Sequence, residues 1–284
     1  MTADHRRGKW AAAILTAQKA DGAWGSVFHS LAQPGSAPLT TEQALRRLHA
    51  LGFTIADEPI RRCISTLSAC LRGERKIDAY WEKGIDWAMF EPLMLGAWIR
   101  RFDPLQPDAL AFAHRWARVA ETGFASGAYD DAAWKAAYES EFHRLARHPQ
   151  PIGFFAMYHA MLLPGLLTPQ TERALVRHVL EHGMYYVCQM PLLTPPAEFA
   201  SKATSGWLAA LEILTAYPAA REELTFAAAH LYLHAAPDGS WDLGAKAADK
   251  VYFPLCDSWR SAENRRRDCT QRIRAFLASL QDAP

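Results

Sequence analysis

The stretch DWAMFEPLMLGAWIRRF, residues 86–102, decides the fold, because apolar side chains cover almost every side of the helix that it predicts. A helix that is apolar all round has to be buried. The preceding stretch, residues 57–73, places Ile60, Ile64 and Leu67 on one stripe and polar residues on its other faces. That pattern predicts a helix with one wet face. Together the two stretches predict an outer helix followed by an inner one.

The same contrast between helices with one solvent-exposed face and helices that are apolar all round recurs along the chain. Valine is rare and alanine abundant, which favours helix over strand. Alternating wet and dry helices joined by short turns are typical of an α/α repeat architecture. No segment resembles an interdomain linker, so the sequence predicts a single all-α domain, 1–284. We expect outer helices at 10–19, 57–72, 168–187 and 219–234, a long outer region at 108–147, and inner helices at 40–51, 86–102, 154–166, 199–217 and 261–280.

Composition excludes several classes of partner. The 284 residues carry a formal net charge of +1, so no strong field attracts nucleic acid. The longest apolar stretch, 154–167, is interrupted by His159 and Pro164 and is too short to span a membrane. Five cysteines without a close CxxC pair indicate a reducing compartment. We therefore expect a cytoplasmic protein with no membrane span and no nucleic-acid partner.

Two segments read as copies of one turn motif. Asp21-Gly22-Ala23-Trp24 ends the first outer helix, and residues 238–241, Asp-Gly-Ser-Trp, end the last one. Asp-Gly is a general turn former. The two copies resemble the QW repeat of squalene–hopene cyclases and the related repeats of protein prenyltransferases. Gln18 supplies the glutamine of the motif in the first copy, whereas the second copy has none.

This resemblance implies an α/α toroid, a ring of about five to six helical hairpins whose last hairpin packs on its first. It also implies a cyclase, isomerase or transferase that acts on a hydrophobic, isoprenoid-type substrate in a central cavity. The chain is similar as well to a group of uncharacterised bacterial proteins. They share its segments 40–47, 86–87 and 253–260.

The catalytic motifs of the resembled families are missing. Terpene cyclases use Asp-x-Asp-Asp or Asp-Asp-x-x-Asp, and the nearest segment here is Asp130-Asp131, followed by two alanines; a helix cap suits it better. Protein prenyltransferases bind zinc through Asp, Cys and a later His, but no histidine follows Asp268-Cys269. No Cys/His cluster has ligand spacing. We expect neither a metal nor a cofactor.

If the inner helices run parallel, their N-termini gather at one mouth of the ring and favour an anion. Near these N-termini, polar residues interrupt the apolar pattern of the inner helices. Asp86 is our candidate general acid or base, because burial beside Trp87 would raise its pKa. Glu42 and His159 complete the candidate catalytic set. The candidate substrate-binding residues, for a hydrophobic or anionic ligand, are Trp87, Tyr158, Lys202, Asp257, Trp259 and Arg260.

Each candidate also has a structural interpretation. Glu42 and Arg46 are spaced to pair along one helix, and a histidine within an apolar helix is often a core residue. Asp86 is placed to cap a helix. Asp257 is placed to cap the last helix or to pair with Arg260 as segment 251–270 folds over the cavity mouth.

Two further functions stay open at this stage. The first is a non-catalytic binding or scaffold protein, which the missing motifs favour. In that case the charged candidates should form satisfied structural pairs. The second is a carbohydrate lyase or hydrolase, in which tryptophan faces stack on sugars and Asp86 and Glu42 serve as acid and base.

Overall fold

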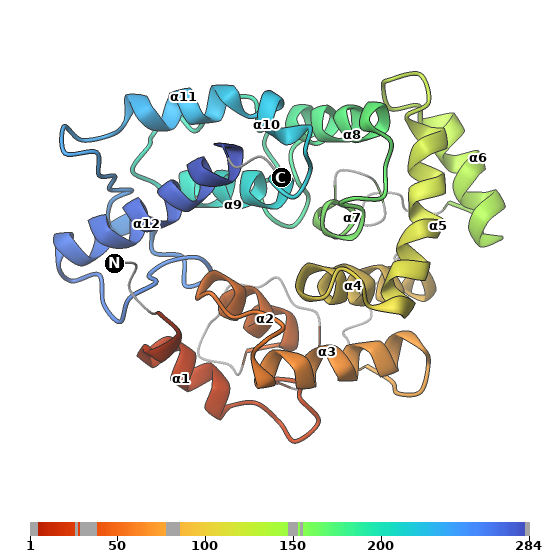
Figure 1. The fold of residues 1–284 in the computed structure, drawn as a ribbon, viewed down its shortest axis with the longest axis horizontal. Coiled ribbons are helices and arrows are strands. Elements are labelled where there is room, and N and C mark those ends of the chain that lie inside the picture. Colours follow the sequence, from red (N-terminus) through yellow and green to blue (C-terminus); the bar gives the residue numbers. More distant parts are fainter. Residues whose placement is uncertain are drawn as a thin grey trace. The chain divides into compact units, whose positions relative to one another are not determined.

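The computed structural model describes residues 5–25, 28, 39–77, 86–146, 153 and 156–281. Within these ranges the chain is helical and contains no strand, as Figure 1 shows. Its only β-type pairing there consists of two isolated bridges, Ala156 with Tyr185 and Met184 with Cys188. The all-α prediction is confirmed.

Contacts divide the chain into two compact units, each described here by itself. Unit 1 comprises Met1–Tyr80, Pro196–Gly206 and Leu231–Ala278, and unit 2 comprises Trp81–Pro195, Trp207–His230 and Ser279–Pro284. The single domain and the toroid stay predictions. Three helices contribute residues to both units: α9 (Lys202–Leu214), α11 (Thr225–Leu233) and α12 (Ala262–Gln281).

Unit 1 begins with two helices, of which the first is mostly exposed to solvent and the second is mostly buried. The N-terminal helix α1 spans Lys9–Thr16 and contacts α2, Thr41–Ala50. A capping box begins α2: Thr40 Oγ1 accepts from Gln43 N at 3.2 Å, and Gln43 Oε1 accepts from Thr40 N at 3.1 Å. This box satisfies two donors at the helix start. The unit also holds α3 (Glu58–Leu71) and the short 3-10 turns η1 (His5–Arg7) and η3 (Ala245–Ala247).

Unit 2 is built around α4, Trp87–Phe102, which packs against α5 and α7 (Figure 1). Most residues of α4 are buried, as its all-round apolar pattern predicts. Gly96 allows its neighbours to approach closely, since a Cβ there would lie 3.2 Å from Phe112 and 3.3 Å from Leu162. The other helices of the unit are α5 (Pro107–Gly123), α6 (Asp131–Phe142), α7 (Met157–Leu162), α8 (Pro169–His182) and α10 (Ala220–Glu223).

The long outer region expected at 108–147 contains two helices, α5 and α6, which form a hairpin. The break falls at Gly127, whose φ is 86°, a left-handed conformation that favours glycine. Asp130 then caps α6, with Oδ1 accepting from Ala133 N at 2.9 Å. The capping interpretation of Asp130 is therefore confirmed.

Other helix ends differ from the sequence prediction. The helix expected at 168–187 ends at His182, because Gly183 has a φ of 83°. The region 219–234 is divided between α10 and α11. Of the helix expected at 154–166, α7 covers Met157–Leu162, and residues 154–155 lie outside the described residues.

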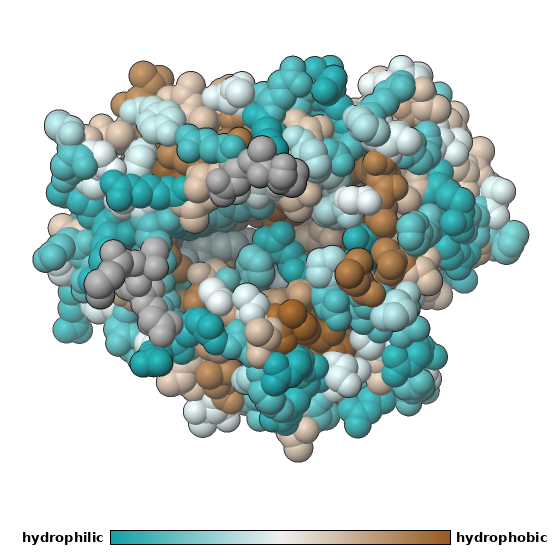
Figure 2. All heavy atoms as spheres, in the orientation of Figure 1, coloured by the Kyte–Doolittle hydropathy of each residue, from teal (hydrophilic) through white to brown (hydrophobic). Residues whose placement is uncertain are grey.

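No helix in the described part of the chain combines the length and apolarity needed to cross a membrane. Hydrophilic residues make up most of the face drawn in Figure 2, and hydrophobic ones gather in small groups. Such scattered groups are normal for a protein surface. Within the described ranges, the exposed large apolar side chains are Leu105, Leu145, Met190, Leu193, Tyr232 and Leu233.

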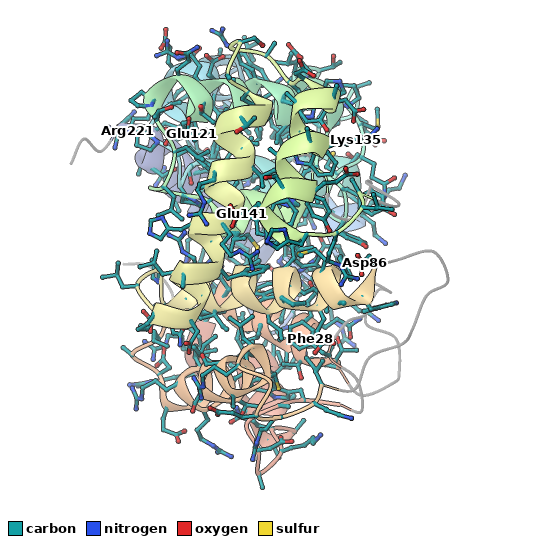
Figure 3. The ribbon with its side chains drawn as sticks, turned by 90° about the vertical axis from the view of Figure 1, so that its right-hand side faces the viewer. Phe28, Asp86, Glu121, Lys135, Glu141 and Arg221 are labelled. Carbon is teal, nitrogen blue, oxygen red and sulfur yellow. The ribbon has the colours of Figure 1, made fainter. Side chains whose placement is uncertain are left out.

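A carboxylate bridges the α5–α6 hairpin. Glu141 on α6 lies beside α5 in Figure 3 and accepts from Arg115 Nε at 2.9 Å and from Arg118 Nη2 at 2.7 Å. These two guanidinium groups lower the pKa of Glu141 to about 2, against an ordinary 4.5. The hydrogen bonds from Arg118 contribute most to the shift.

We expect this bridge to make unfolding pH-dependent. The folded-state pKa of Glu141 lies below its unfolded value, so its stabilising contribution is complete above pH 4.5 and is lost as the pH falls toward 2. Both arginines are substantially exposed, so solvent screening limits the contribution to about 1 kcal/mol. Glu141→Gln should therefore unfold more easily than wild type at pH 7 and converge with it near pH 2. Urea melts across this range measure the difference, and equal gaps at both ends would contradict the assignment.

Candidate functional site

The two Asp-Gly turns of unit 1 have the same hydrogen bonds. Trp24 Nε1 donates to Ile14 O at 2.7 Å, and Trp241 Nε1 donates to Leu231 O at 2.7 Å, in each case ten residues earlier. The backbone N–H of each tryptophan donates to a threonine hydroxyl at 2.9 Å. The acceptor is Thr41 Oγ1 in the first copy and Thr270 Oγ1 in the second. The two segments are therefore structural copies of one another.

The glutamine missing from the second copy has a counterpart elsewhere. Gln18 Nε2 donates to Gly22 O at 2.9 Å and ties the first turn to Pro59 O at 2.8 Å. In the second copy Arg274 Nη2 donates to the equivalent carbonyl, Gly239 O, at 3.0 Å. A residue distant in the sequence thus satisfies the same acceptor.

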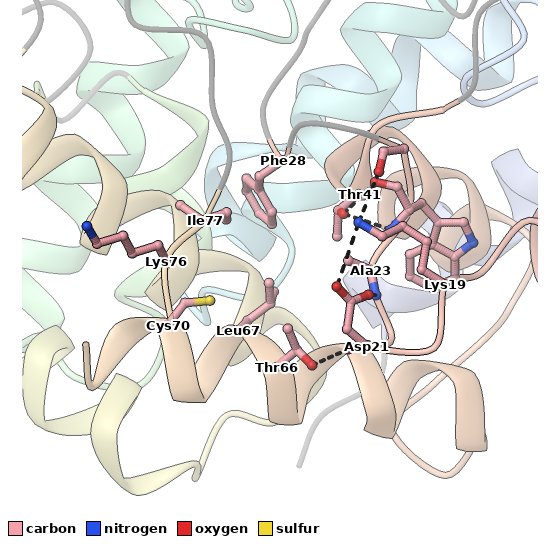
Figure 4. Close-up of a pocket in the computed structure, with 12 residues that line it drawn as sticks. Lys19, Asp21, Ala23, Phe28, Thr41, Thr66, Leu67, Cys70, Lys76 and Ile77 are labelled. Atoms are coloured by element: carbon pink, nitrogen blue, oxygen red, sulfur yellow. Dashed lines mark hydrogen bonds and ion pairs between the residues drawn. The ribbon is translucent and has the colours of Figure 1, made fainter. Parts of the chain in front are cut away.

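A small pocket of about 70 Å³ lies beside the first turn, between it and α3 (Figure 4). Three of its polar residues interact with one another: Thr66 Oγ1 donates to Asp21 O, and Lys19 Nζ lies 3.7 Å from the Asp21 carboxylate. Pockets that bury a drug-sized ligand measure roughly 300–1,000 Å³. This pocket is too small for an isoprenoid chain.

Unit 1 contains five of the candidate site residues. Glu42 is buried with Arg46 Nη2 at 3.6 Å, so the helical pair considered for it is present. Lys202 begins α9 and borders, with Lys246, an open surface depression. Asp257 Oδ1 accepts from Lys9 N at 2.7 Å. It therefore provides an acceptor for the first backbone N–H of α1, and not for one at the start of α12. The remaining two are Trp259 and Arg260.

The expected pairing of Asp257 with Arg260 is not found among the described residues. Arg260 is exposed, and its backbone N–H donates to Ser258 Oγ at 3.2 Å. The buried carboxylate of this segment is Asp268. Its Oδ2 accepts from Leu255 N at 2.8 Å, Cys256 N at 2.9 Å and Trp259 Nε1 at 2.7 Å.

A second carboxylate and two buried arginines complete this polar cluster. Asp249 Oδ1 accepts from three successive backbone N–H groups, those of residues 251–253. Arg47 donates to Val251 O and Pro254 O, and burial lowers its pKa to about 10. Arg272 donates to Ser205 Oγ at 3.0 Å. The cluster holds segment 249–259 in place through α2, α9 and α12.

Sequence reasoning missed this cluster. The sequence contained one indication of the cluster: charged residues occupy core-facing positions of predicted inner helices. Arg47 lies on one such helix, and Asp268 and Arg272 lie on another. Two arginines and two carboxylates balance in charge, and the chain itself supplies partners to Asp249, Arg47, Arg272 and Oδ2 of Asp268, whereas Oδ1 of Asp268 has no hydrogen-bond partner among the described residues. We therefore assign the cluster a structural role.

Unit 2 contains the other four candidates: Asp86, Trp87, Tyr158 and His159. Asp86 precedes α4 without a side-chain cap bond. Both of its oxygens accept from Arg144, Oδ2 from Nε at 2.9 Å and Oδ1 from Nη2 at 2.7 Å. Figure 3 shows Asp86 at the end of α4. A role as base would require this ion pair to open.

Four aromatic rings meet at the start of α4. Phe90 lies 5.4 Å from Trp87 and 5.5 Å from Tyr158 on α7, both edge-on. Tyr186, from the loop after α8, lies 5.4 Å from Tyr158 and 6.2 Å from Phe90. The structure thus brings the predicted Trp87 and Tyr158 into one aromatic cluster, which we define as Trp87, Phe90, Tyr158 and Tyr186.

Tyr186 has a φ of 77°. A non-glycine residue in this left-handed region stores strain, which is common at functional sites. The loop is held there by the main chain, since Met157 N donates to Tyr185 O at 3.2 Å and Cys188 N donates to Met184 O at 2.9 Å.

His159 is fully buried, with its ring edge-on to Trp116 at 4.4 Å. Burial lowers its pKa to about 3, so it is neutral at physiological pH. A catalytic role would use the neutral imidazole. This environment matches the core-residue interpretation of a histidine in an apolar helix.

Glu91 is a carboxylate that the sequence analysis did not select. It lies half-buried on α4, one turn after Trp87 on the same side of the helix. Burial raises its pKa above 4.5. The available signal was a single acidic residue inside an otherwise apolar helix.

No protein-family model matches the chain, and searches of curated proteins and of solved structures find no significant match. Among the described residues no group of three or more His, Cys, Asp or Glu side chains is placed to hold a metal ion. The resemblance to cyclases and prenyltransferases therefore remains a prediction from the sequence.

Proposed function

We propose that this protein binds a hydrophobic, isoprenoid-type molecule and acts on it as a cyclase, isomerase or transferase, on an α/α-toroid scaffold. The aromatic cluster of unit 2 carries the proposal. Its rings come from α4, α7 and the loop after α8. Asp86 directly precedes Trp87 in the sequence, and Glu91 follows it by one helical turn.

The chemistry of the cluster suits such a ligand. Aromatic faces bind hydrocarbon and stabilise positive charge that develops on it. Glu91 is the acid in this proposal, because a raised pKa keeps a carboxyl protonated at higher pH. Asp86, held by Arg144, is a positioning residue or a base.

The repeated turn supports the scaffold. Each copy follows a helix, and in each copy the tryptophan is hydrogen-bonded to that helix and to a threonine on a later one. Such a unit joins consecutive hairpins in a helical repeat architecture.

The test is incubation of the protein with prenyl diphosphates and squalene analogues, with product analysis by mass spectrometry. We expect at least one substrate to be converted. Glu91→Gln should keep substrate affinity and lose turnover by roughly 100-fold, the usual contribution of a general acid. Glu181→Gln, at an exposed position of α8, is the matched control. Unchanged substrates and no binding across the panel would refute the proposal.

A non-catalytic binding protein is the second candidate. It is favoured by the pairing of the charged candidates, Asp86 with Arg144 and Glu42 with Arg46. Binding of a panel member without conversion, unaffected by Glu91→Gln, would select this alternative. The carbohydrate-active alternative stays a prediction of the sequence.

A further inference from the structure

An open depression lies at the start of α9, within unit 1. It measures about 660 Å³, which is within the range of roughly 300–1,000 Å³ found for small-molecule sites. Apart from two lysines, the side chains that line it are short and leave this space open: Ser201, Ala203, Ala245 and Ala248. The depression is therefore large enough for a small organic molecule.

The two lysines are Lys202, on the first turn of α9, and Lys246, in η3. Both are exposed, and neither side chain has a hydrogen bond or an ion pair within the described part of the chain. The acidic residue nearest to Lys246 in the sequence is Asp249, which is already engaged. Its Oδ2 accepts from Ser205 Oγ at 2.8 Å, and its Oδ1 accepts from three backbone N–H groups. The depression therefore presents two positive charges that no described side chain pairs with.

The main chain adds two donors to these charges. Ser201 precedes α9, and its Oγ accepts from Thr204 N at 3.2 Å. The first two N–H groups of a helix have no intrahelical acceptor. In α9 they belong to Lys202 and Ala203, both of which line the depression. Such a helix start favours an anion and so acts in the same direction as the lysines.

Unit 1 as a whole carries an excess of positive charge. Its described residues include 20 lysines and arginines against 12 aspartates and glutamates, an excess of eight. The net charge of +1 for the whole chain conceals this excess, because acidic residues predominate in unit 2. Excess charge of one sign raises the local concentration of a ligand of the opposite sign. The field of the unit and the two lysines of the depression therefore favour the same class of ligand.

We propose that this depression binds the phosphate group of a small organic molecule. Lys202 and Lys246 hold the phosphate, with the first two N–H groups of α9 as further donors, and the organic part lies over the alanines. Lysine binds phosphate as a point charge, and the double negative charge of a phosphate matches two ammonium groups better than a carboxylate does. The space exceeds what an inorganic ion needs, so the phosphate belongs to an organic molecule. The aromatic cluster and Glu91 of the proposed function lie in unit 2, so this site does not depend on them.

The test is calorimetric titration of the full chain at low salt with phenyl phosphate and with inorganic phosphate. Phenyl phosphate should bind more tightly, and added salt should weaken both ligands. Lys202→Met and Lys246→Met should each weaken phenyl phosphate binding roughly 5-fold, the upper range for an exposed ion pair. The melting temperature should not change, because both side chains are exposed. Lys76→Met, at an exposed lysine that does not line the depression, is the matched control and should bind as wild type does.

Three results would contradict the proposal. If neither phosphate binds at low salt, the depression is an ordinary solvated surface. If binding is unaffected by both Lys202→Met and Lys246→Met, the phosphate is held elsewhere on the basic surface of unit 1. If the two phosphates bind with equal affinity, no organic part is recognised and the ligand is an inorganic ion.

Discussion

Replacement of Asp268 by alanine is expected to lower the free energy of unfolding by about 4 kcal/mol. Oδ2 of this carboxylate accepts three hydrogen bonds, from Leu255 N, Cys256 N and Trp259 Nε1. Asp268 is fully buried, so water cannot readily take its place. Each donor left without an acceptor costs about 1–3 kcal/mol. The substitution should also release segment 249–259 from the core of unit 1.

Thermal and urea melts measure this effect. For a chain of this length the melting temperature should fall by roughly 10 °C. Asp268→Asn, whose amide oxygen can still accept, should lose less than half as much. Asp257→Ala is the matched control, because Asp257 is exposed and accepts a backbone N–H from Lys9. A change of less than about 1 kcal/mol in Asp268→Ala, within the range of an ordinary surface substitution, would show that the cluster does not hold this segment.

Trp24→Ala and Trp241→Ala should each lower the free energy of unfolding by about 4 kcal/mol, and by similar amounts. Both indoles are buried, and removal of a buried tryptophan typically costs about 3–5 kcal/mol. The similarity follows from the geometry, because each indole N–H bonds a carbonyl ten residues earlier at 2.7 Å. Urea melts of the two variants make the comparison.

Phenylalanine variants isolate the hydrogen bond from the packing. Trp24→Phe and Trp241→Phe keep most of the apolar contact and lose the N–H, so the bond accounts for about 1 kcal/mol of each loss. Gln18→Ala and Arg274→Ala remove the equivalent bonds to Gly22 O and Gly239 O. Each should cost less than the tryptophan change. Unequal losses between the copies, by more than about 2 kcal/mol, would mean that the two turns are not energetically equivalent.

Features that depend on neighbouring residues were predictable from the sequence. The apolar periodicity of 86–102 correctly predicted a buried helix, since a helix repeats its faces every few residues. The Thr40/Gln43 box was predictable because the partners of a helix cap lie within one turn. The cap at Asp130 follows the same rule. The outer region at 108–147 shows the limit: the sequence did not place its division at Gly127, because one glycine is also tolerated inside a helix.

The candidate site was predictable only in part. The aromatic pattern pointed to Trp87 and Tyr158, and the structure joins them through Phe90. It did not reveal that Arg144, far along the chain, would hold Asp86. Nor did it indicate that the hydroxyl of Tyr138, on α6, would be buried with no hydrogen-bond partner among the described residues.

The sequence by itself determined the helical class, several helix caps and the two Asp-Gly turns, because these depend on local backbone hydrogen bonds and side-chain periodicity. Only the tertiary structure decided which charges are buried and what satisfies them. Arg47 bonds a carbonyl more than two hundred residues away, and Asp268 bonds a loop that folds back on its own helix. A buried charge is tolerated only where distant groups supply its partners, and residue spacing along the chain contains no record of those partners.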